Sequence, residues 1–261
     1  MQLIYFSPTH TTQKVVEAIA RGINDGKANH HHVVHRNLTL TSHECEVPTD
    51  EITLFGVPVY GGRVPAEATR RLKQIKGNQT PAVVVVVYGN RAYEDALLEL
   101  RDIVTEQGFV PIAAAAFIGE HSYTTSDYPI APGRPDTEDL QKAAAFGARI
   151  NELLQEAKML SPVAVPGNFP YKPLGQKPSI APITVADKCD QCGICVSVCP
   201  TGAITLNDLP ETDASACILC CACIKECPTD ARVNDSGFIK EKSQWLVDNY
   251  SERKEPEIFV E

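Results

Sequence analysis

Two runs of four cysteines constrain this chain more than any other feature of its 261 residues. Each run has the spacing C-x2-C-x2-C-x3-C, and a proline follows directly. The first run comprises Cys189, Cys192, Cys195 and Cys199, and the second comprises Cys217, Cys220, Cys223 and Cys227. Each cysteine of the second run lies 28 residues after its counterpart, so the segment is an internal repeat. Cysteines this dense, in a chain without an export signal, are typical of metal ligands.

Two other interpretations of the cysteines explain less. A zinc ribbon needs two CxxC pairs and leaves four cysteines at regular spacing without a role. Structural disulfides need an oxidising compartment. Met1–Phe6 leads straight into a strand-like segment, without the basic start, apolar stretch and cleavage site of a signal peptide. The chain also lacks an apolar run long enough to span a membrane. We therefore expect a cytoplasmic protein.

The doubled run resembles that of bacterial-type ferredoxins, which carry two [4Fe–4S] clusters. In that pattern the fourth cysteine of each run ligates the other cluster. The resemblance thus implies one cluster held by Cys189, Cys192, Cys195 and Cys227, and another held by Cys217, Cys220, Cys223 and Cys199. Cys221 interrupts the second run. It could replace Cys220 as a ligand, but that would break the 28-residue register, so we interpret it as a non-ligand. Cys45, which has no patterned partner, is interpreted as an ordinary free thiol.

The preceding residues alternate between strand and helix patterns. Apolar segments predict strands at 3–6, 33–38, 52–59, 81–88 and 110–118. Helices are predicted over 15–23, 66–75, 93–106 and 136–159. Pro81–Tyr88 is apolar on both faces, as a central parallel strand must be. The pattern predicts an α/β fold, a flavodoxin-like doubly wound parallel five-stranded sheet, followed by a small α+β two-cluster ferredoxin domain.

A loop rich in hydroxyl groups follows the first strand. It contains Ser7, Thr9, His10, Thr11 and Thr12, and it resembles the flavodoxin phosphate loop S/T-x-T-G-x-T. Hydroxyls and backbone N–H groups at a helix N-terminus can bind a monophosphate. His10 stands where the family prefers glycine, so a positive φ there would carry a modest cost. The sequence has neither GK[ST] nor GxGxxG at this place, which argues against a P-loop or a dinucleotide site. The alternative is a helix cap that binds no ligand.

Two further loops are predicted to hold the ring of FMN. They comprise Pro58, Val59, Tyr60, Gly61 and Gly62 after the third strand, and Tyr88, Gly89, Asn90, Arg91 and Tyr93 after the fourth. Glycines let the backbone approach the ring, and tyrosines can stack on it. The segment after the fifth strand, Gly119–Tyr123, also falls where the ring would rest. Its His121 could protonate a flavin or substrate or could serve a structural role. We assign no catalytic residue.

Together these segments resemble the flavodoxin–ferredoxin fusion family of anaerobic bacteria and archaea. Its members carry segments of the types YFSPTGTT, PVYGGRVP, YGNR, EHS and GRPD. The corresponding segments are Tyr5–Thr12, Pro58–Pro65, Tyr88–Arg91, Glu120–Ser122 and Gly133–Asp136. The resemblance covers nearly the whole chain and implies FMN, two [4Fe–4S] clusters, electron transfer and an anaerobic source. It fixes no substrate.

Domain boundaries follow from these patterns. We expect a flavodoxin-like FMN-binding domain over 1–160, a linker over 161–182, a two-cluster ferredoxin domain over 183–235, and a C-terminal helix and tail over 236–261. The linker contains six prolines, which exclude a continuous helix and favour an extended, semi-rigid segment. Phe238–Tyr250 is predicted as a terminal helix that packs on either domain.

The charge distribution bears on partners. The formal net charge of −9 argues against nucleic acid. Residues 183–235 carry three Lys and Arg against eight Asp and Glu, which favours a redox partner protein with a basic docking face. A homo-oligomer is compatible with the sequence.

The expected cofactors suggest three functions. Clusters transfer single electrons, whereas FMN accepts two. The first hypothesis is therefore a redox carrier or adaptor that converts between one-electron and two-electron transfer. The alternative is a flavin-dependent reductase fed by its own clusters. An open pocket with Tyr60, Arg63, Arg91 or His121 converging on it would favour that enzyme. A third hypothesis is a redox sensor whose flavodoxin fold binds no flavin.

Overall fold

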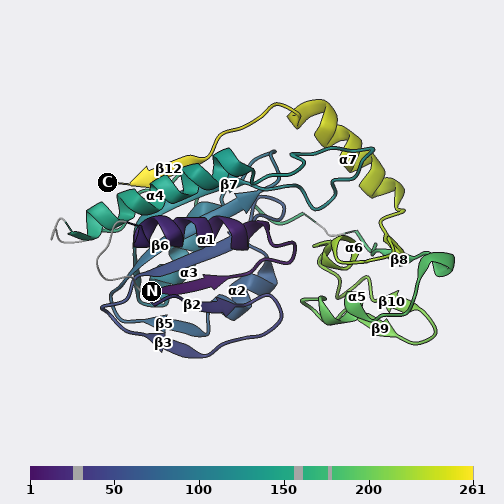
Figure 1. Ribbon diagram of the computed structural model, residues 1–261, viewed down its shortest axis with the longest axis horizontal. Helices are drawn as coiled ribbons and strands as arrows, with labels where there is room; N and C mark the ends of the chain where they lie inside the picture. Colours follow the sequence, from purple (N-terminus) through teal and green to yellow (C-terminus); the bar gives the residue numbers. More distant parts are fainter. Residues whose placement is uncertain (26–31, 156–160, 176–177, 261) are drawn as a thin grey trace.

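The computed structural model describes residues 1–25, 32–155, 161–175 and 178–260. An α/β domain and a small cysteine-rich lobe lie side by side (Figure 1). The chain leaves the α/β domain, forms the lobe, and returns through helix α7 and strand β12 to the sheet. Two segments of the chain therefore connect the lobe to the α/β domain. No helix in the described ranges is long and apolar enough to cross a membrane.

The central sheet has six strands in the order β12-β7-β6-β4-β1-β2. Their bounds are Gln2–Tyr5 (β1), Val34–Asn37 (β2), Thr53–Pro58 (β4), Thr80–Tyr88 (β6), Phe109–Ile118 (β7) and Glu257–Val260 (β12). The first five strands of the chain's main sheet pair in parallel. Counted along the chain, their order is 2-1-3-4-5, which defines a flavodoxin-like fold. The predicted fold class is confirmed.

Helices cover both faces of this sheet. Helices α1 (Thr11–Asn24) and α4 (Thr137–Gln155) pack on one face, and α2 (Ala66–Leu72) and α3 (Ala96–Glu106) pack on the other. Strand β6 contributes alternate side chains to the two cores: Val83 and Val85 to the first, Val84 and Val86 to the second. All four are fully buried. The continuous apolar run in the sequence reflects this burial on both faces.

Several predicted helix ends need correction. The helix predicted over 66–75 ends at Leu72, because Ile75 begins strand β5 (Ile75–Gly77) and is fully buried there. This strand pairs in parallel with β3 (Cys45–Val47), which was not predicted. The helix predicted from Tyr93 begins at Ala96, because Glu94 has a φ of 46°, which a right-handed helix does not allow. Residues 156–159 of the predicted closing helix lie outside the described residues.

Strand β12 was also not predicted. The expected terminal helix is present as α7 (Gly237–Tyr250), and the chain beyond it runs back along the α/β domain. Glu257–Val260 then pair antiparallel with β7, from Ala116 to Ala113. The C-terminal residues thus complete the sheet of the α/β domain and cover the edge of β7.

The small lobe consists of short elements around the cysteines. They are β8 (Ile183–Thr184), a 3₁₀ turn (Ala186–Lys188), α5 (Ile194–Ser197), β9 (Ile204–Leu206), β10 (Pro210–Thr212), α6 (Ala222–Lys225) and β11 (Arg232–Val233). Arg232 is almost completely buried at the centre of the lobe. Its guanidinium donates to Thr184 Oγ1 at 2.6 Å and to the carbonyls of Pro182 and Pro210. One side chain thus joins strand β8 to the β9–β10 hairpin.

The described part of the linker is extended and is bound along the α/β domain. The Asp95 carboxylate accepts hydrogen bonds from the backbone N–H groups of Asn168 and Lys172, at 2.8 and 2.6 Å. Asp95 directly precedes helix α3, and Asp102 within that helix accepts a hydrogen bond from the Tyr171 hydroxyl at 2.6 Å. Residues 161–175 of the linker are therefore fixed on the α/β domain. The domain boundaries themselves stay predictions.

Candidate functional site

The eight cysteines of the repeat line two cavities in the small lobe. One cavity, of about 280 Å³, is lined by Cys189, Cys192, Cys195 and Cys227. The other, of about 310 Å³, is lined by Cys199, Cys217, Cys220 and Cys223. Each cavity therefore takes three cysteines from one run and the fourth from the other. This grouping is the crossed one that the ferredoxin resemblance implies, and the ligation itself stays a prediction.

The residues at both cavities fit an iron–sulfur cluster. In the described ranges, no three His, Cys, Asp or Glu side chains converge closely enough to hold a single metal ion. Thiols arranged around a cavity suit the larger cubane better than one zinc ion. The backbone N–H of Ala203 donates to Cys199 Sγ at 3.2 Å, and that of Ala231 donates to Cys227 Sγ at 3.3 Å. Such N–H···S bonds occupy corresponding places in the repeat and stabilise thiolates.

Arg232 is a functional residue that the sequence pattern did not reveal. Burial raises the pKa of Cys220 to about 12 and that of Cys223 to about 11. Burial also raises the pKa of Cys195, in the other cavity. The nearby Arg232 guanidinium lowers the pKa of both Cys195 and Cys223. One buried cation therefore favours the thiolate form at both cavities, and bound iron would do so far more strongly.

The two cavities differ in their distance from the α/β domain. Ile218, on the wall of the 310 Å³ cavity, packs against the hydrophobic core of that domain. Arg71 of helix α2 donates to the carbonyl of Pro200 on the same wall, at 2.5 Å. We call this the proximal cavity. In the other cavity, Cys192 is exposed to solvent, and we call it the distal cavity.

Two tyrosines of the α/β domain interact electrostatically with thiols of the proximal cavity. Burial raises the pKa of Tyr60 and that of Tyr123, and neighbouring thiols raise both further. These thiols belong to Cys217, Cys220 and Cys221. Tyr60 lies in a predicted flavin loop, and Tyr123 lies in the loop after β7. The proximal cavity therefore faces the carboxyl end of the sheet, where doubly wound folds bind their ligands.

The predicted phosphate loop has the backbone of an anion site. His10 has a φ of 62° and precedes helix α1, whose first turn contains no acidic residue. Ser7 Oγ caps the helix by accepting from the backbone N–H of Gln13 at 3.1 Å. Thr12 Oγ1 is buried without a hydrogen-bond partner among the described residues. A phosphate oxygen would supply the acceptor that this hydroxyl lacks.

His10 also connects the phosphate loop to the small lobe. Its Nε2 lies 3.1 Å from the Glu226 carboxylate. The positive φ shows why the family prefers glycine at this position. The His10–Glu226 contact offers a compensating attraction between the two parts of the chain.

The two ring loops contain close approaches that favour glycine. Gly62 has a φ of 86°, and a Cβ built on it would lie 1.7 Å from Glu94. A Cβ on Gly89 would lie 2.3 Å from the His121 ring. Asn90 Oδ1 is buried without a partner in the described structure. With Thr12, it places two orphaned polar atoms in loops predicted to bind FMN, so the loops fit the cofactor.

The other predicted ring-loop residues point in different directions. Tyr88 and Tyr93 are buried, with ring centroids 5.4 Å apart, and Tyr93 donates to Glu257 at 2.8 Å. Pro58 and Val59 are half-buried at the end of β4. Gly61 is exposed with a φ of 63°. Thr9 and Thr11 are half-buried near the helix start. Of the tyrosines in the two ring loops, Tyr60 is the one whose pKa is raised by the thiols of the proximal cavity.

The arginines that could mark a reductase pocket are engaged in ion pairs. Arg63 binds the Glu99 carboxylate at 2.7 Å and the carbonyl of Lys172 at 2.6 Å. Arg91 binds Glu94 at 2.6 Å. These two side chains therefore do not converge on one pocket with Tyr60.

His121 is held as a neutral imidazole. Burial lowers the pKa of His121 to about 4, and the positive charges of Lys242, Arg91 and Lys225 lower it further. Its Nδ1 accepts a hydrogen bond from the backbone N–H of Tyr123 at 3.0 Å. At neutral pH the side chain is therefore unprotonated and structurally engaged, which makes it a poor proton donor.

The C-terminal strap, residues 250–260, is a second feature that the sequence did not reveal. Asn90 donates to the carbonyls of Tyr250 and Glu252, at 2.6 and 2.8 Å. Lys254 Nζ donates to the carbonyl of Arg91 at 2.5 Å. The strap therefore holds the ring loop at 88–93 directly. Space between this loop and the strap forms an open groove lined by tyrosine and glutamate side chains.

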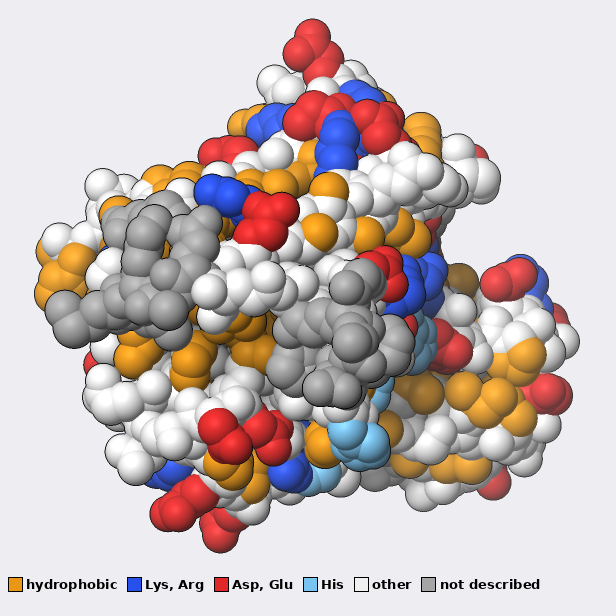
Figure 2. Space-filling view, turned by 60° about the vertical axis from the view of Figure 1, so that its left-hand side comes forward, with side chains coloured by type: hydrophobic (Ala, Val, Ile, Leu, Met, Phe, Trp, Pro, Cys, Tyr) orange, Lys and Arg blue, Asp and Glu red, His pale blue; other side chains and the backbone are white. Residues whose placement is uncertain are grey.

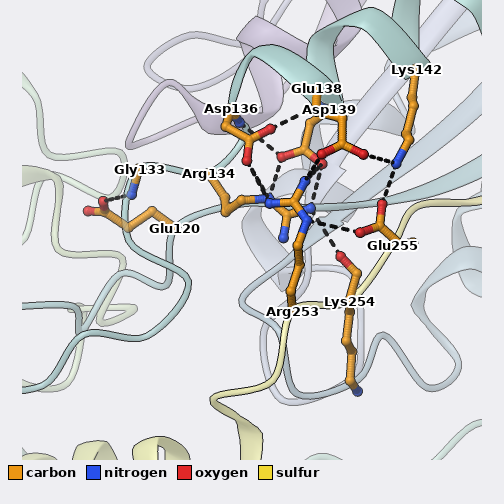
Figure 3. Close-up of polar contacts among 10 residues, drawn as sticks. All are labelled: Glu120, Gly133, Arg134, Asp136, Glu138, Asp139, Lys142, Arg253, Lys254 and Glu255. Carbon is orange, nitrogen blue, oxygen red and sulfur yellow. Dashed lines mark hydrogen bonds and ion pairs between the residues drawn. The ribbon is translucent and has the colours of Figure 1, made fainter.

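The strap is also bound to the start of helix α4, as Figure 3 shows. Arg253 lies between the carboxylates of Asp136 and Glu138, at 2.7 and 3.2 Å. The Arg134 guanidinium binds Asp139 and donates to the carbonyl of Lys254 at 3.1 Å. These contacts join residues more than a hundred positions apart in sequence.

In the space-filling view, the small lobe projects from the larger body (Figure 2). A hollow separates the two at its upper side, and basic and histidine side chains lie on the wall of the larger body. Lys225 of α6 bridges the two parts by binding Glu120 at 2.7 Å and the carbonyl of Thr124 at 3.0 Å.

Comparisons with known proteins agree with parts of this description. A family described as a 4Fe-4S binding domain matches residues 182–205, which include the first cysteine run. No curated protein matches the chain. The solved structures that match include the Flv1 flavodiiron core from Synechocystis sp. PCC6803, at 19% identity and a TM-score of 0.41. That match covers 60% of this chain but 36% of the flavodiiron core.

Two flavodoxins show similar values. A flavodoxin from the domain Archaea is 15% identical over 59% of this chain and 97% of its own, with a TM-score of 0.38. The Fusobacterium nucleatum flavodoxin bound to flavin mononucleotide is 14% identical over 58% of this chain and 96% of its own, with a TM-score of 0.37.

The strand order and the matched family show two parts of the chain. A flavodoxin-like α/β domain is joined to a segment that matches a 4Fe-4S binding domain. The matched residues account for one cluster motif, and the second cluster stays a prediction.

Proposed function

We propose that this protein transfers electrons between a partner redox protein and FMN through two [4Fe–4S] clusters, as a carrier or adaptor. One observation carries the proposal. The wall of the proximal cysteine cavity contacts the α/β domain through Ile218 and through the Pro200 carbonyl bound by Arg71, while the distal cavity reaches the surface at Cys192. The two cavities therefore form a path from solvent to the carboxyl end of the sheet.

The phosphate loop and the ring loops support FMN as the cofactor of the α/β domain. Ser7, Thr9, His10, Thr11 and Thr12 would hold its phosphate, and the loops at 58–62 and 88–93 would hold its ring. Bound FMN exchanges either one or two electrons. The contribution of the chain is to hold the ring at the carboxyl end of the sheet, on the side of the proximal cavity.

The arrangement favours a carrier over a reductase. A reductase needs room above the flavin for a substrate and side chains that orient it. Arg63 and Arg91 are bound to Glu99 and Glu94, and His121 is neutral and occupied by the Tyr123 backbone. We therefore propose a protein partner, rather than a small-molecule substrate, as the source or acceptor of electrons.

The first experiment measures the cofactors of protein purified without oxygen. Iron, sulfide and flavin are assayed on one sample, before and after addition of FMN. The proposal expects about eight irons and one FMN per chain. Eight irons with no uptake of FMN would remove the flavin from the mechanism and leave a ferredoxin with a docking domain. About four irons would remove the second cluster.

A further inference from the structure

The two halves of the cysteine repeat have the same backbone but different surroundings. Counterparts 28 residues apart share left-handed conformations: Gly193 and Cys221 have φ of 75° and 62°. Gln191 and Leu219 likewise have φ of 59° and 55°. Helices α5 and α6 begin at equivalent positions, directly after Gly193 and Cys221. Differences in burial between the halves therefore come from what covers them.

At several positions of the repeat, the residue at the proximal cavity is more buried than its counterpart at the distal cavity. Cys220 is 8% exposed, whereas Cys192 is exposed to solvent. Pro200 is buried, whereas Pro228 is exposed. Ile218 packs against the α/β core, whereas its counterpart Asp190 is exposed. The proximal face is covered by the α/β domain, and the equivalent distal face is open.

The covered face shows what kind of surface fits this repeat. The α/β domain offers a cation, Arg71, to the carbonyl of Pro200 at 2.5 Å. It also offers its hydrophobic core to Ile218 on the cavity wall. A basic group beside an apolar surface thus lies against the proximal cavity within this chain.

The sequences of the two halves differ in a way that suits two kinds of contact. At the proximal face, the second run has Ile218, Leu219 and Cys221, which are apolar and suit a permanent interface. The first run has Asp190, Gln191 and Gly193 at the same positions. Transient interfaces, such as those of electron-transfer proteins, are smaller and more polar. The open face therefore has the composition of a transient docking surface.

We propose that this open face is the docking surface for a separate one-electron redox protein with a basic contact surface. We define the distal face as Asp190, Cys192, Gly193, Ile194 and Pro228. The proposal rests on the proposed function and adds the place of contact. The partner would approach the distal cluster as the α/β domain approaches the proximal one, with cations around an apolar centre.

The charges around the distal face support a basic partner. Asp187 and Asp230 are exposed and lie within three residues of the face in sequence, and the exposed Glu211 follows Pro210, which lines the distal cavity. Of the three basic residues between positions 183 and 235, Lys225 binds Glu120 and Arg232 is buried, which leaves Lys188. Ile194 and Leu206 are 36% and 40% exposed and give the face an apolar part. Charge complementarity would steer and orient a basic protein here.

The experiment uses the holoprotein, reduced without oxygen, and cytochrome c as a basic haem-protein probe. Stopped-flow absorbance gives the second-order rate constant of cytochrome reduction at several ionic strengths. Asp190→Lys is the test variant. Glu152→Lys is the control variant. Glu152 is an exposed residue of helix α4 in the α/β domain, so its substitution makes the same change in net charge away from the distal face. Iron and flavin contents confirm that each variant is loaded equally.

We expect Asp190→Lys to lower the rate constant about tenfold at low salt, and Glu152→Lys to change it less than about twofold. The difference should shrink as salt is raised. If Asp190→Lys loses iron, Asp187→Lys replaces it as the test variant, because Asp187 lies outside the cavity wall. Equal effects of the two sites, or no effect at either, would overturn the docking surface.

Two further readouts separate this proposal from others. Electron exchange between clusters and flavin should be unchanged in Asp187→Lys, because Asp187 lies outside the cavity wall and the lobe interface is intact. If the wild-type protein lacks that exchange, the proposed function fails, and the cytochrome rates still decide the docking surface. A wild-type dimer in sedimentation that Asp190→Lys abolishes would assign the face to a second copy of this chain and overturn the proposal.

Discussion

At the residue scale, Cys221 is the position where the repeat departs from its own pattern. It has a left-handed backbone, as Gly193 has in the first run, and it is 1% exposed. Its Sγ accepts from Asn234 at 3.3 Å and lies 3.5 Å from the carbonyl of Leu219. These contacts support the interpretation that Cys221 is a buried neighbour of the cluster rather than a ligand.

This interpretation predicts opposite results for adjacent cysteines. Cys221→Gly should keep about eight irons per chain, because glycine accepts the left-handed backbone. Cys220→Ala should lose about four irons, because the proximal cluster lacks a ligand. Iron and sulfide assays on protein purified without oxygen show which of the two cysteines is the ligand. Loss of iron from the glycine variant with retention in the alanine variant would reverse the ligand assignment.

His10→Gly should stabilise the phosphate loop. A non-glycine residue at a φ of 62° carries strain, and the exposed His10–Glu226 pair offsets little of it. We expect the free energy of unfolding to rise by about 1 kcal/mol. FMN affinity should be equal or higher. Thermal unfolding and flavin fluorescence titration measure both, and a loss of stability would show that the contact with Glu226 outweighs the strain.

His121 makes stability depend on pH. The pKa of 6.5 in the unfolded chain falls to about 4 in the fold, mainly through burial. The unfolded state therefore takes up a proton first, and stability falls as the pH drops from 6.5 towards 4. In His121→Gln this loss should be smaller between about pH 7 and about pH 5. Thermal unfolding at both values measures the effect. An unchanged pH dependence would contradict the assignment.

At the element scale, the C-terminal strap and the ring loop at 88–93 depend on each other. Asn90 binds two strap carbonyls through one amide, and its φ of 63° fixes the loop beside them. Asn90→Ala should lower the free energy of unfolding by about 2 kcal/mol, because two partly buried carbonyls lose their side-chain donor. It should also weaken FMN binding. Asn249→Ala is the control, because its side chain bonds within exposed α7.

Thermal unfolding and flavin titration compare the two variants. Equal effects of Asn90→Ala and Asn249→Ala would show that the strap does not hold the loop.

The elements also show how far the sequence could predict this structure. Apolar runs such as Pro81–Tyr88 identify the central strands, because burial on both faces leaves a continuous pattern. The resemblance of the cysteine runs to two-cluster ferredoxins implied the crossed grouping that is seen around the two cavities. Strand β12 has four residues and forms through pairing with β7, so its local pattern carries little signal. The contact of Arg253 with Asp136 spans 117 positions and has no local signature.

At the scale of the whole molecule, the small lobe is attached at both ends. The linker is bound to helix α3 through Asp95 and Asp102, and the strap returns to the sheet through β12. Arg71, Lys225 and His10 add direct contacts between the lobe and the α/β domain. This attachment keeps the proximal cavity next to the predicted flavin loops. Electrons should therefore pass within one chain rather than by collision of two.

The rate of electron exchange within the holoprotein tests this claim most directly. A light pulse with a deazaflavin donor injects single electrons, and absorbance at flavin and cluster wavelengths follows their redistribution. Attachment at both ends predicts a first-order phase whose rate is independent of protein concentration. A rate proportional to protein concentration, or no exchange between flavin and clusters, would contradict a relay inside one chain.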